Sequence, residues 1–170
     1  MQTNKKLMKY ALLAAALVSA PAFALQSDSK QPIAISADYG ELDQKNQTTM
    51  LSGNVEVKQG SIYLRAEKLN LSQDGSGRQF FKASGKPVRF SQTLDGNKGT
   101  VNGEAAQVEY SSATNVVKLM GNAKVTRGGD KAEGAVITYN TRTEVYTVSG
   151  SKPAGGSKGK RVSIIIQPNQ

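Results

Sequence analysis

The sequence contains no cysteine, no histidine and no tryptophan, and these absences exclude much of enzyme chemistry. Without cysteine the chain can form no disulfide, carries no thiolate nucleophile and offers no sulfur ligand to a metal ion. Without histidine it has neither a Ser-His-Asp triad nor an imidazole ligand. We therefore expect no catalytic residue, no metal site and no cofactor.

One acidic group remains as a candidate for acid–base chemistry or for calcium: Asp38, Glu41 and Asp43. Its spacing lacks the glycine and the final glutamate of an EF-hand loop. Acidic residues at such positions in a hairpin are usually solvated turn residues. We interpret the group as structural and expect that the protein is not an enzyme.

The first 24 residues have the pattern of a secretory signal peptide. Three lysines precede an apolar run over residues 10–18, and the small residues of 22–24 form a typical cleavage site. The apolar run is shorter than the roughly 20 residues that span a bilayer. We expect cleavage near Leu25 and a soluble protein outside the cytoplasm, most simply in a bacterial periplasm.

Loss of the signal peptide removes three lysines and no acidic residue, so the formal net charge falls from +9 to +6. The remaining length suits one domain, which we expect over residues 25–166, with a tail over 167–170. The basic residues are scattered and form no arginine-rich stripe, and with export this argues against nucleic acid as a partner.

Four short segments about thirty residues apart share one pattern, in which mostly apolar residues stand two and four positions before a glycine. The glycines are Gly53, Gly85, Gly121 and Gly150. Self-similarity at such a spacing is typical of an architecture in which each unit needs its neighbours to bury its apolar face. Because the pattern has a period of two, it predicts that the units consist of strands. The sequence predicts a repetitive all-β protein.

Turn residues between the alternating segments predict antiparallel strand pairs whose apolar faces meet in a rolled sandwich or a solenoid-like jelly roll. We expect the four glycines at corners where strands bend or at places where another backbone approaches closely. Pro87 removes a ladder donor and predicts a bulge or an edge after Gly85, with the inward positions shifted to Val88 and Phe90. In the third unit we place Ala106 on the apolar face.

Five segments, in this order and spacing, resemble the OstA-like family of periplasmic lipopolysaccharide-transport proteins: Gln31-Pro32-Ile33, Leu51-Ser52-Gly53-Asn54-Val55, Gly85-Lys86-Pro87, Leu119-Met120-Gly121-Asn122-Ala123 and Gly159-Lys160-Arg161-Val162. The resemblance covers essentially the whole chain after the signal peptide. It implies a twisted antiparallel β-jelly roll, built from repeated strand pairs and open at both ends. It also implies an apolar interior that receives the acyl chains of lipid A, the lipid part of lipopolysaccharide.

The alternation of apolar and polar residues identifies sixteen candidates for the lining of such an interior, and these are the nominated residues. They are Ile33, Ile35, Leu51, Val55, Val57, Ile62, Leu64, Leu69, Phe81, Phe90, Val108, Val117, Leu119, Val125, Ile137 and Tyr146. For any one of them, the alternative is an ordinary core residue that packs only on other protein atoms.

Both ends of the domain read as sheet edges that can pair with another chain. Residues 151–160 are rich in glycine, lysine and serine, and we expect a flexible segment there before a β-prone edge strand over 161–166. The alternative for this strand is a buried position that completes the roll. The residues nominated for the edges are Gln31, Ile33, Ile35, Arg161, Val162, Ile164 and Ile166.

The resemblance implies partners for these edges: an inner-membrane-anchored transport component at the N-terminal edge, an outer-membrane translocon at the C-terminal edge, and further copies joined head to tail. A periplasmic glycan-binding module or a structural assembly module is the alternative function. A glycan-binding module would want clustered exposed aromatics, whereas Tyr39, Tyr63 and Tyr110 are dispersed along the chain.

Overall fold

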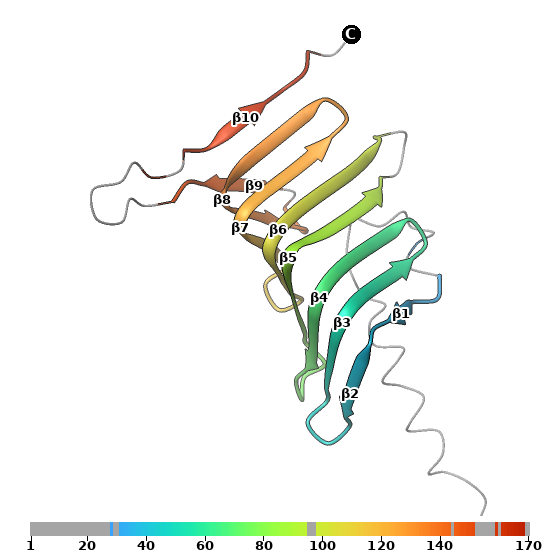
Figure 1. Cartoon of the computed structure of the whole chain (residues 1–170). Helices are drawn as coiled ribbons and strands as arrows, with labels where there is room; N and C mark the ends of the chain where they lie inside the picture. The colour runs from blue at the N-terminus through green and yellow to red at the C-terminus, as the bar shows by residue number, and fades with distance from the viewer. Residues whose placement is uncertain are drawn as a thin grey trace, which may run out of the picture.

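In the part of the chain that the structure describes, ten β-strands belong to one antiparallel sheet (Figure 1). The computed structural model describes residue 28 and residues 31–94, 98–143, 145–151, 159 and 161–168. The expected signal peptide, 1–24, and most of the expected flexible segment, 151–160, lie outside the described residues. The all-β prediction is confirmed.

Six long strands pair in the order of the sequence and make up most of the sheet: β3 (Thr48–Gln59), β4 (Ile62–Gln73), β5 (Gln79–Thr93), β6 (Thr100–Ser111), β7 (Val116–Arg127) and β8 (Asp130–Asn140). Four short strands flank them: β1 (Ala34–Ser36), β2 (Tyr39–Asp43), β9 (Val145–Ser149) and β10 (Ser163–Ile165). β1 and β2 pair with the two halves of β3, and β10 and β9 pair with the two halves of β8.

A line of register irregularities, which we call the crease, crosses the sheet between these halves. Each of the five pairings of long strands slips near its middle, at Ser52/Val55, Arg65/Lys68, Ser84/Val88, Glu104/Gln107 and Met120/Ala123. Bulges bend a strand and increase its twist, and Figure 1 shows the long strands bending along their length. The crease divides the sheet into a β1–β10 arm and a β2–β9 arm, each named for its short edge strands.

Three of the four repeated glycines lie at the crease, as predicted. Gly53 and Gly121 have φ angles of 75° and 79°, a region that favours glycine, and the Lys86-Pro87 peptide after Gly85 is cis. The prediction for Gly150 is wrong, because β9 ends at Ser149 and never crosses the crease.

The crease also changes which alternate positions face inward. Ala83 and Val88 are both completely buried on either side of the irregularity in β5, which confirms the predicted shift. The inward placement of Ala106 is wrong: it is exposed, whereas Ala105 is 1% exposed. The slip between Glu104 and Gln107 turns the Ala106 side chain outward.

Eleven buried apolar residues form the core. Several are alanines at the crease, where a small side chain lets the two arms approach closely. Full burial of a larger member such as Leu69 or Ile137 stabilises the fold by about 1.5–3 kcal/mol. The members are Val55, Leu64, Ala66, Leu69, Ala83, Val88, Ala105, Val108, Leu119, Ala123 and Ile137.

The outer face carries the charges. One row of six charged residues crosses the β1–β10 arm at matched register positions: Glu56, Arg65, Arg89, Glu104, Lys124 and Glu133. Glu104 accepts ion pairs from both neighbouring strands, with Arg89 Nε and Lys124 Nζ each 3.8 Å away. Each exposed pair adds little stability. A slip of one residue, however, would turn these charges toward the apolar face, so the row disfavours wrong registers.

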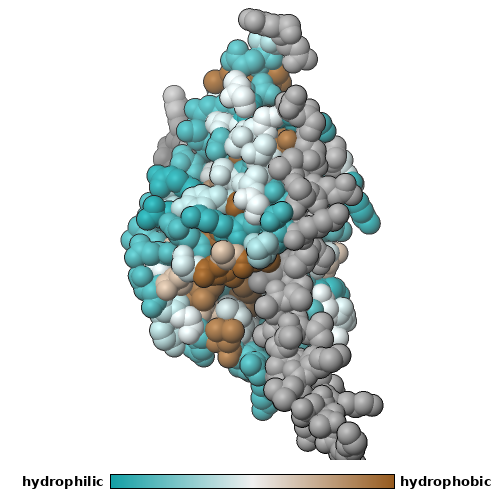
Figure 2. All heavy atoms as spheres, turned by 90° about the vertical axis from the view of Figure 1, so that its right-hand side faces the viewer, coloured by the Kyte–Doolittle hydropathy of each residue, from teal (hydrophilic) through white to brown (hydrophobic). Residues whose placement is uncertain are grey.

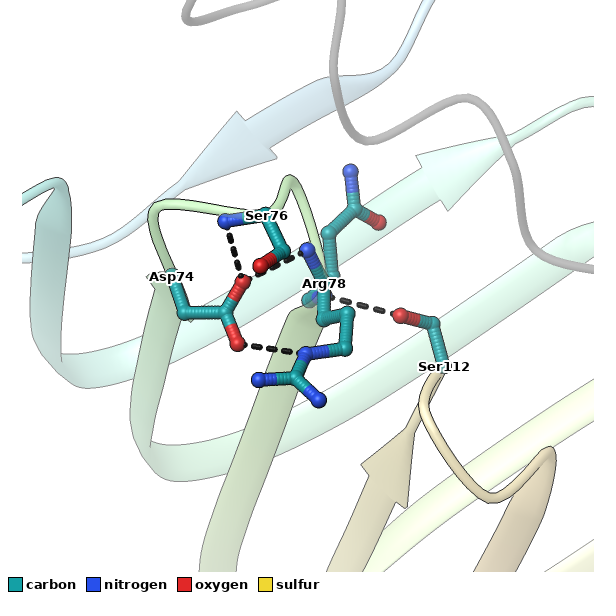
Figure 3. Close-up of polar contacts among 5 residues, drawn as sticks. Asp74, Ser76, Arg78 and Ser112 are labelled. Atoms are coloured by element: carbon teal, nitrogen blue, oxygen red, sulfur yellow. Dashed lines mark hydrogen bonds and ion pairs between the residues drawn. The ribbon is translucent and has the colours of Figure 1, made fainter.

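The turn after β4 is closed by Asp74 (Figure 3). Its Oδ1 accepts hydrogen bonds from the backbone N–H of Ser76 at 2.9 Å and of Arg78 at 3.0 Å, and its Oδ2 accepts one from Arg78 Nε at 2.6 Å. The backbone N–H of Gln79 donates to Ser112 Oγ at 2.8 Å, which joins this turn to the turn after β6. The hydrogen bond from the Arg78 backbone is the main cause that lowers the pKa of Asp74.

We expect a side chain at Gly121, in the crease, to destabilise the fold. Gly121→Ala would place Cβ 2.8 Å from the Ala106 side chain at a positive φ, so we expect a loss of about 1–3 kcal/mol in the free energy of unfolding. Gly75→Ala, in open space in a turn, is the matched control. Urea unfolding followed by circular dichroism measures both; equal stability of the two variants would contradict the role of the crease glycine.

We expect the Asp74 turn to make the stability of the fold depend on pH in the acidic range. Because the folded pKa of Asp74 is lowered, its contribution is present above the unfolded value of about 3.9 and is lost as the pH falls below it. We therefore expect the free energy of unfolding to fall less between pH 5 and pH 2.5 in Asp74→Asn than in the parent chain. Glu67→Gln, which removes another exposed carboxylate, should follow the parent; an Asp74→Asn variant that does the same would contradict the prediction.

Candidate apolar binding groove

The inner faces of the two arms enclose a groove of about 330 Å³, a size typical of ligand sites. Nineteen of its twenty-eight lining residues are aliphatic or aromatic, and the other nine are Gln, Ser or Thr. No charged residue of the described chain is among them. Figure 2 shows apolar side chains gathered in one region of the visible face, with hydrophilic residues around them.

Register pairing aligns many of the lining residues in rows that cross the whole sheet; the rows also contain Leu42, Gly103, Ala132 and Ile164, which do not line the groove. In the β1–β10 arm one row consists of Ile35, Val57, Leu64, Phe90, Gly103, Val125, Ala132 and Ile164. In the β2–β9 arm another consists of Leu42, Thr49, Leu71, Phe81, Tyr110, Val117, Tyr139 and Tyr146. The groove runs across the strands along these rows, since its lining includes Ile35 of β1 at one edge of the sheet and Tyr146 of β9 at the other.

One glycine makes room for a large side chain on the groove wall. Gly103 is buried opposite Phe90, and a Cβ at this position would overlap the far end of the Phe90 ring. The ring therefore covers the backbone of β6. At the C-terminal side, Tyr139 and Tyr146 pack with ring centroids 4.1 Å apart.

The polar lining residues lie toward the strand ends, and several already have partners. Gln59 Nε2 donates to the carbonyl oxygen of Gln31 at 3.2 Å, which ties the segment before β1 to the groove. Thr141 Oγ1 donates to the carbonyl oxygen of Asn115 at 3.2 Å. The groove thus has uncharged polar residues near its rims and an apolar interior.

Fourteen of the sixteen residues nominated from sequence line the groove. Val55 does not, because it lies at the crease with 0% exposure. Leu51 does not either; it is half-buried and packs against the core. Alternation missed fourteen other lining residues. They are Gln47, Thr49, Gln59, Leu71, Ser72, Gln73, Gln79, Phe80, Ser91, Gln92, Val101, Tyr110, Tyr139 and Thr141.

The two nominated edges lie at opposite ends of the β1–β10 arm. Ile35 belongs to β1, while Ile33 lines the groove and Gln31 is exposed just before it. Ile164 belongs to β10, all three residues of which are exposed, so the alternative of a buried last strand is wrong. Arg161, Val162 and Ile166 flank β10 and are exposed as well.

The acidic group of the sequence analysis serves turns and the crease. Asp38 Oδ2 accepts a hydrogen bond from Asn54 Nδ2 at 2.9 Å, next to Gly53. Asp43 accepts hydrogen bonds from the backbone N–H of Asn46 and of Lys45, each at 3.0 Å, and the bond from Asn46 is the main cause that lowers the pKa of Asp43. Within the described residues, no group of three acidic side chains could hold a metal ion.

Comparison with known proteins agrees with this architecture. A family model described as "LptA/(LptD N-terminal domain) LPS transport protein" matches residues 34–145. The chain is 34% identical to the lipopolysaccharide export system protein LptA of Escherichia coli K12, over 99% of this chain and 89% of that protein. It is also 34% identical to the export system protein LptH of Pseudomonas aeruginosa, over 93% of this chain and 91% of that protein.

The crystal structure of P. aeruginosa LptH, described as the LptA-homologous periplasmic component of the lipopolysaccharide transport device, superimposes with a TM-score of 0.69. The two share 32% sequence identity, over 84% of this chain and 99% of that one. Fold and groove define an all-β protein whose twisted sheet is unclosed and carries an apolar groove. The chain belongs to the family of lipopolysaccharide transport proteins formed by LptA and the N-terminal domain of LptD.

In the part of the chain that the structure describes, no helix has the length and apolarity needed to cross a membrane.

Proposed function

We propose that this protein is a periplasmic component of lipopolysaccharide transport, whose groove shields the acyl chains of lipid A from water. The observation that carries the proposal is the uncharged, mostly apolar groove that crosses the entire sheet. Family membership supports the substrate class, since the relatives are named lipopolysaccharide export system proteins. We also propose that the signal peptide is cleaved before Leu25 and that one domain spans residues 25–166.

The energetics of lipid transfer call for such a groove. Each methylene that is exposed to water costs about 0.8 kcal/mol, so several long acyl chains cannot cross an aqueous compartment unshielded. A groove that is open at the sheet edges can pass a chain onward, whereas a closed cavity must release it into water. The role is that of a carrier, and it needs no catalytic residue.

We further propose that the sheet edges join this protein to its partners. Each edge has backbone groups that a strand of another chain can pair with, and pairing in line would continue the groove from one domain into the next. The N-terminal edge, with β1, would face the inner-membrane-anchored component, and the C-terminal edge, with β10, the outer-membrane translocon. Copies of this chain would join head to tail; unlike edges do not close a ring by themselves and allow filaments.

The alternative of a glycan-binding module has less support. Stacking platforms for sugars need neighbouring exposed aromatic rings. Tyr39 is exposed on β2, Tyr63 donates a hydrogen bond to Glu56 on the outer face, and Tyr110 lines the groove. The three rings belong to three different strands, β2, β4 and β6. A purely structural assembly module would use the same edges but would bind no lipid.

Photo-crosslinking tests the lipid path. A photo-reactive amino acid at Leu119 or at Phe90, both of which line the groove, should form adducts with lipopolysaccharide. The same probe at Thr114, which is exposed in the turn after β6, should form few, because the acyl chains stay inside. Mass spectrometry of the irradiated mixture measures the adducts. Adducts at none of these positions, or equally at all, would contradict the proposal.

Truncation tests the docking edge. Removal of residues 161–170 deletes β10 and should abolish end-to-end oligomers in analytical ultracentrifugation over a concentration series. The far-UV circular dichroism of the β-fold should remain, since β10 is exposed and pairs only with half of β8. A chain that ends at Pro168 keeps β10 and is the matched control. Persistence of the oligomers after truncation, or loss of folding, would contradict this role of the edge.

A further inference from the structure

Two buried side-chain polar atoms in the described part of the chain have no hydrogen-bond partner: Gln92 Nε2 and the hydroxyl oxygen of Tyr110. Both side chains line the groove. A buried polar group without a partner costs about 1–3 kcal/mol, and most such groups in native proteins are paired. Both unpaired atoms thus belong to side chains that line the groove, which points to a ligand as the missing partner.

The two atoms come from different arms. Gln92 belongs to the β1–β10 arm, pairs with Val101 and is 8% exposed. Tyr110 belongs to the β2–β9 arm, in register between Phe81 and Val117. Each of the two walls that face the groove therefore contains one polar side chain with an unpaired buried atom.

Gln59 shows that a glutamine in this groove can be satisfied by the protein itself. It is 7% exposed, nearly the same as Gln92, and its Nε2 donates to the carbonyl oxygen of Gln31. The unpaired state of Gln92 is thus not a general property of glutamines in the lining.

The chemistry of the two groups defines the ligand group that would pair with them. An amide nitrogen can only donate, and a tyrosine hydroxyl can donate. Burial raises the pKa of Tyr110, so the hydroxyl keeps its proton at neutral pH. The complementary group is an acceptor. Because the described lining has no cation to neutralise an anion, the acceptor should be uncharged.

We propose that Gln92 and Tyr110 bind the carbonyl oxygens of ester-linked or amide-linked fatty acyl chains. This inference rests on the proposed function, since it assumes that acyl chains occupy the groove. It adds a preference for chains that carry a carbonyl group, which the apolar rows cannot supply. The methylenes of a chain contribute affinity, but they do not fix the position of the chain along the groove. A carbonyl stands at one end of each chain, and donors on both walls bind that end. Because both donor atoms are buried, binding requires the two side chains to turn toward the ligand.

Three matched probes test the preference: methyl dodecanoate, which has an ester carbonyl; 1-methoxydodecane, the ether that lacks it; and dodecanoate, the free acid. Their affinities for the chain without its signal peptide are measured by displacement of 1-N-phenylnaphthylamine fluorescence. We expect the ester to bind about 3- to 10-fold more tightly than the ether, the value of one net hydrogen bond. The free acid should bind more weakly than the ester.

The variants Gln92→Leu and Tyr110→Phe should each reduce the ratio of ester to ether affinity, and the double variant should bring it close to one. Both remove an unpaired polar group, so they should fold at least as well as the parent, which thermal unfolding by circular dichroism checks. Gln59→Leu is the matched control in the groove and should change both affinities by the same factor. Tyr63→Phe is the control on the outer face and should change neither.

The outcomes separate this inference from the function on which it rests. Equal affinity for ester and ether in the parent chain, or a preference that survives in the double variant, would overturn the inference and leave an apolar acyl-binding groove. Tightest binding of dodecanoate would also overturn it, because the recognised group would then be a carboxylate. Failure of all three probes to displace the fluorophore would overturn both the inference and the proposed acyl binding.

Discussion

The crease is the constraint on which the rest of the structure depends. A sheet of long strands with one apolar face must cover that face, and a flat sheet would need a second layer. Here five register slips, one in each pairing of the long strands, bend the single sheet so that its own two arms provide the cover. The core is correspondingly concentrated where the arms meet, in alanines and valines such as Ala83, Val88 and Ala105.

The same bend leaves space farther from the crease. Side chains that face inward but lie farther from the crease, such as Phe81 and Val125, are only partly buried and line the groove. An ordinary sandwich would fill this space with side chains from a second sheet. In this fold the division between core and groove is therefore a matter of distance from the crease, and the same alternation of residues serves both.

Much of the fold could be predicted from sequence because its signals are local. Alternation gave the inward rows, and Gly53, Gly121 and Pro87 gave three of the bends. The bend at Ala105 and Ala106 has no glycine or proline to mark it, which explains why Ala106 was placed on the wrong face. Gly150 has the local signal, but its strand is too short to cross the crease, and strand length depends on pairing with β8. Gln92 could not be nominated from hydropathy, since a polar residue at an inward position breaks the alternation.

The rows of matched residues have a consequence for motion. An acyl chain that lies in the groove crosses successive strands, which are about 4.8 Å apart. Moving it by one strand replaces Leu64 with Phe90, or Phe81 with Tyr110, so these steps exchange one large side-chain contact for another. For the methylenes of the chain, the energy along the groove would then rise and fall only slightly from strand to strand. Such a surface would hold a lipid against escape into water and would offer its methylenes little resistance to sliding.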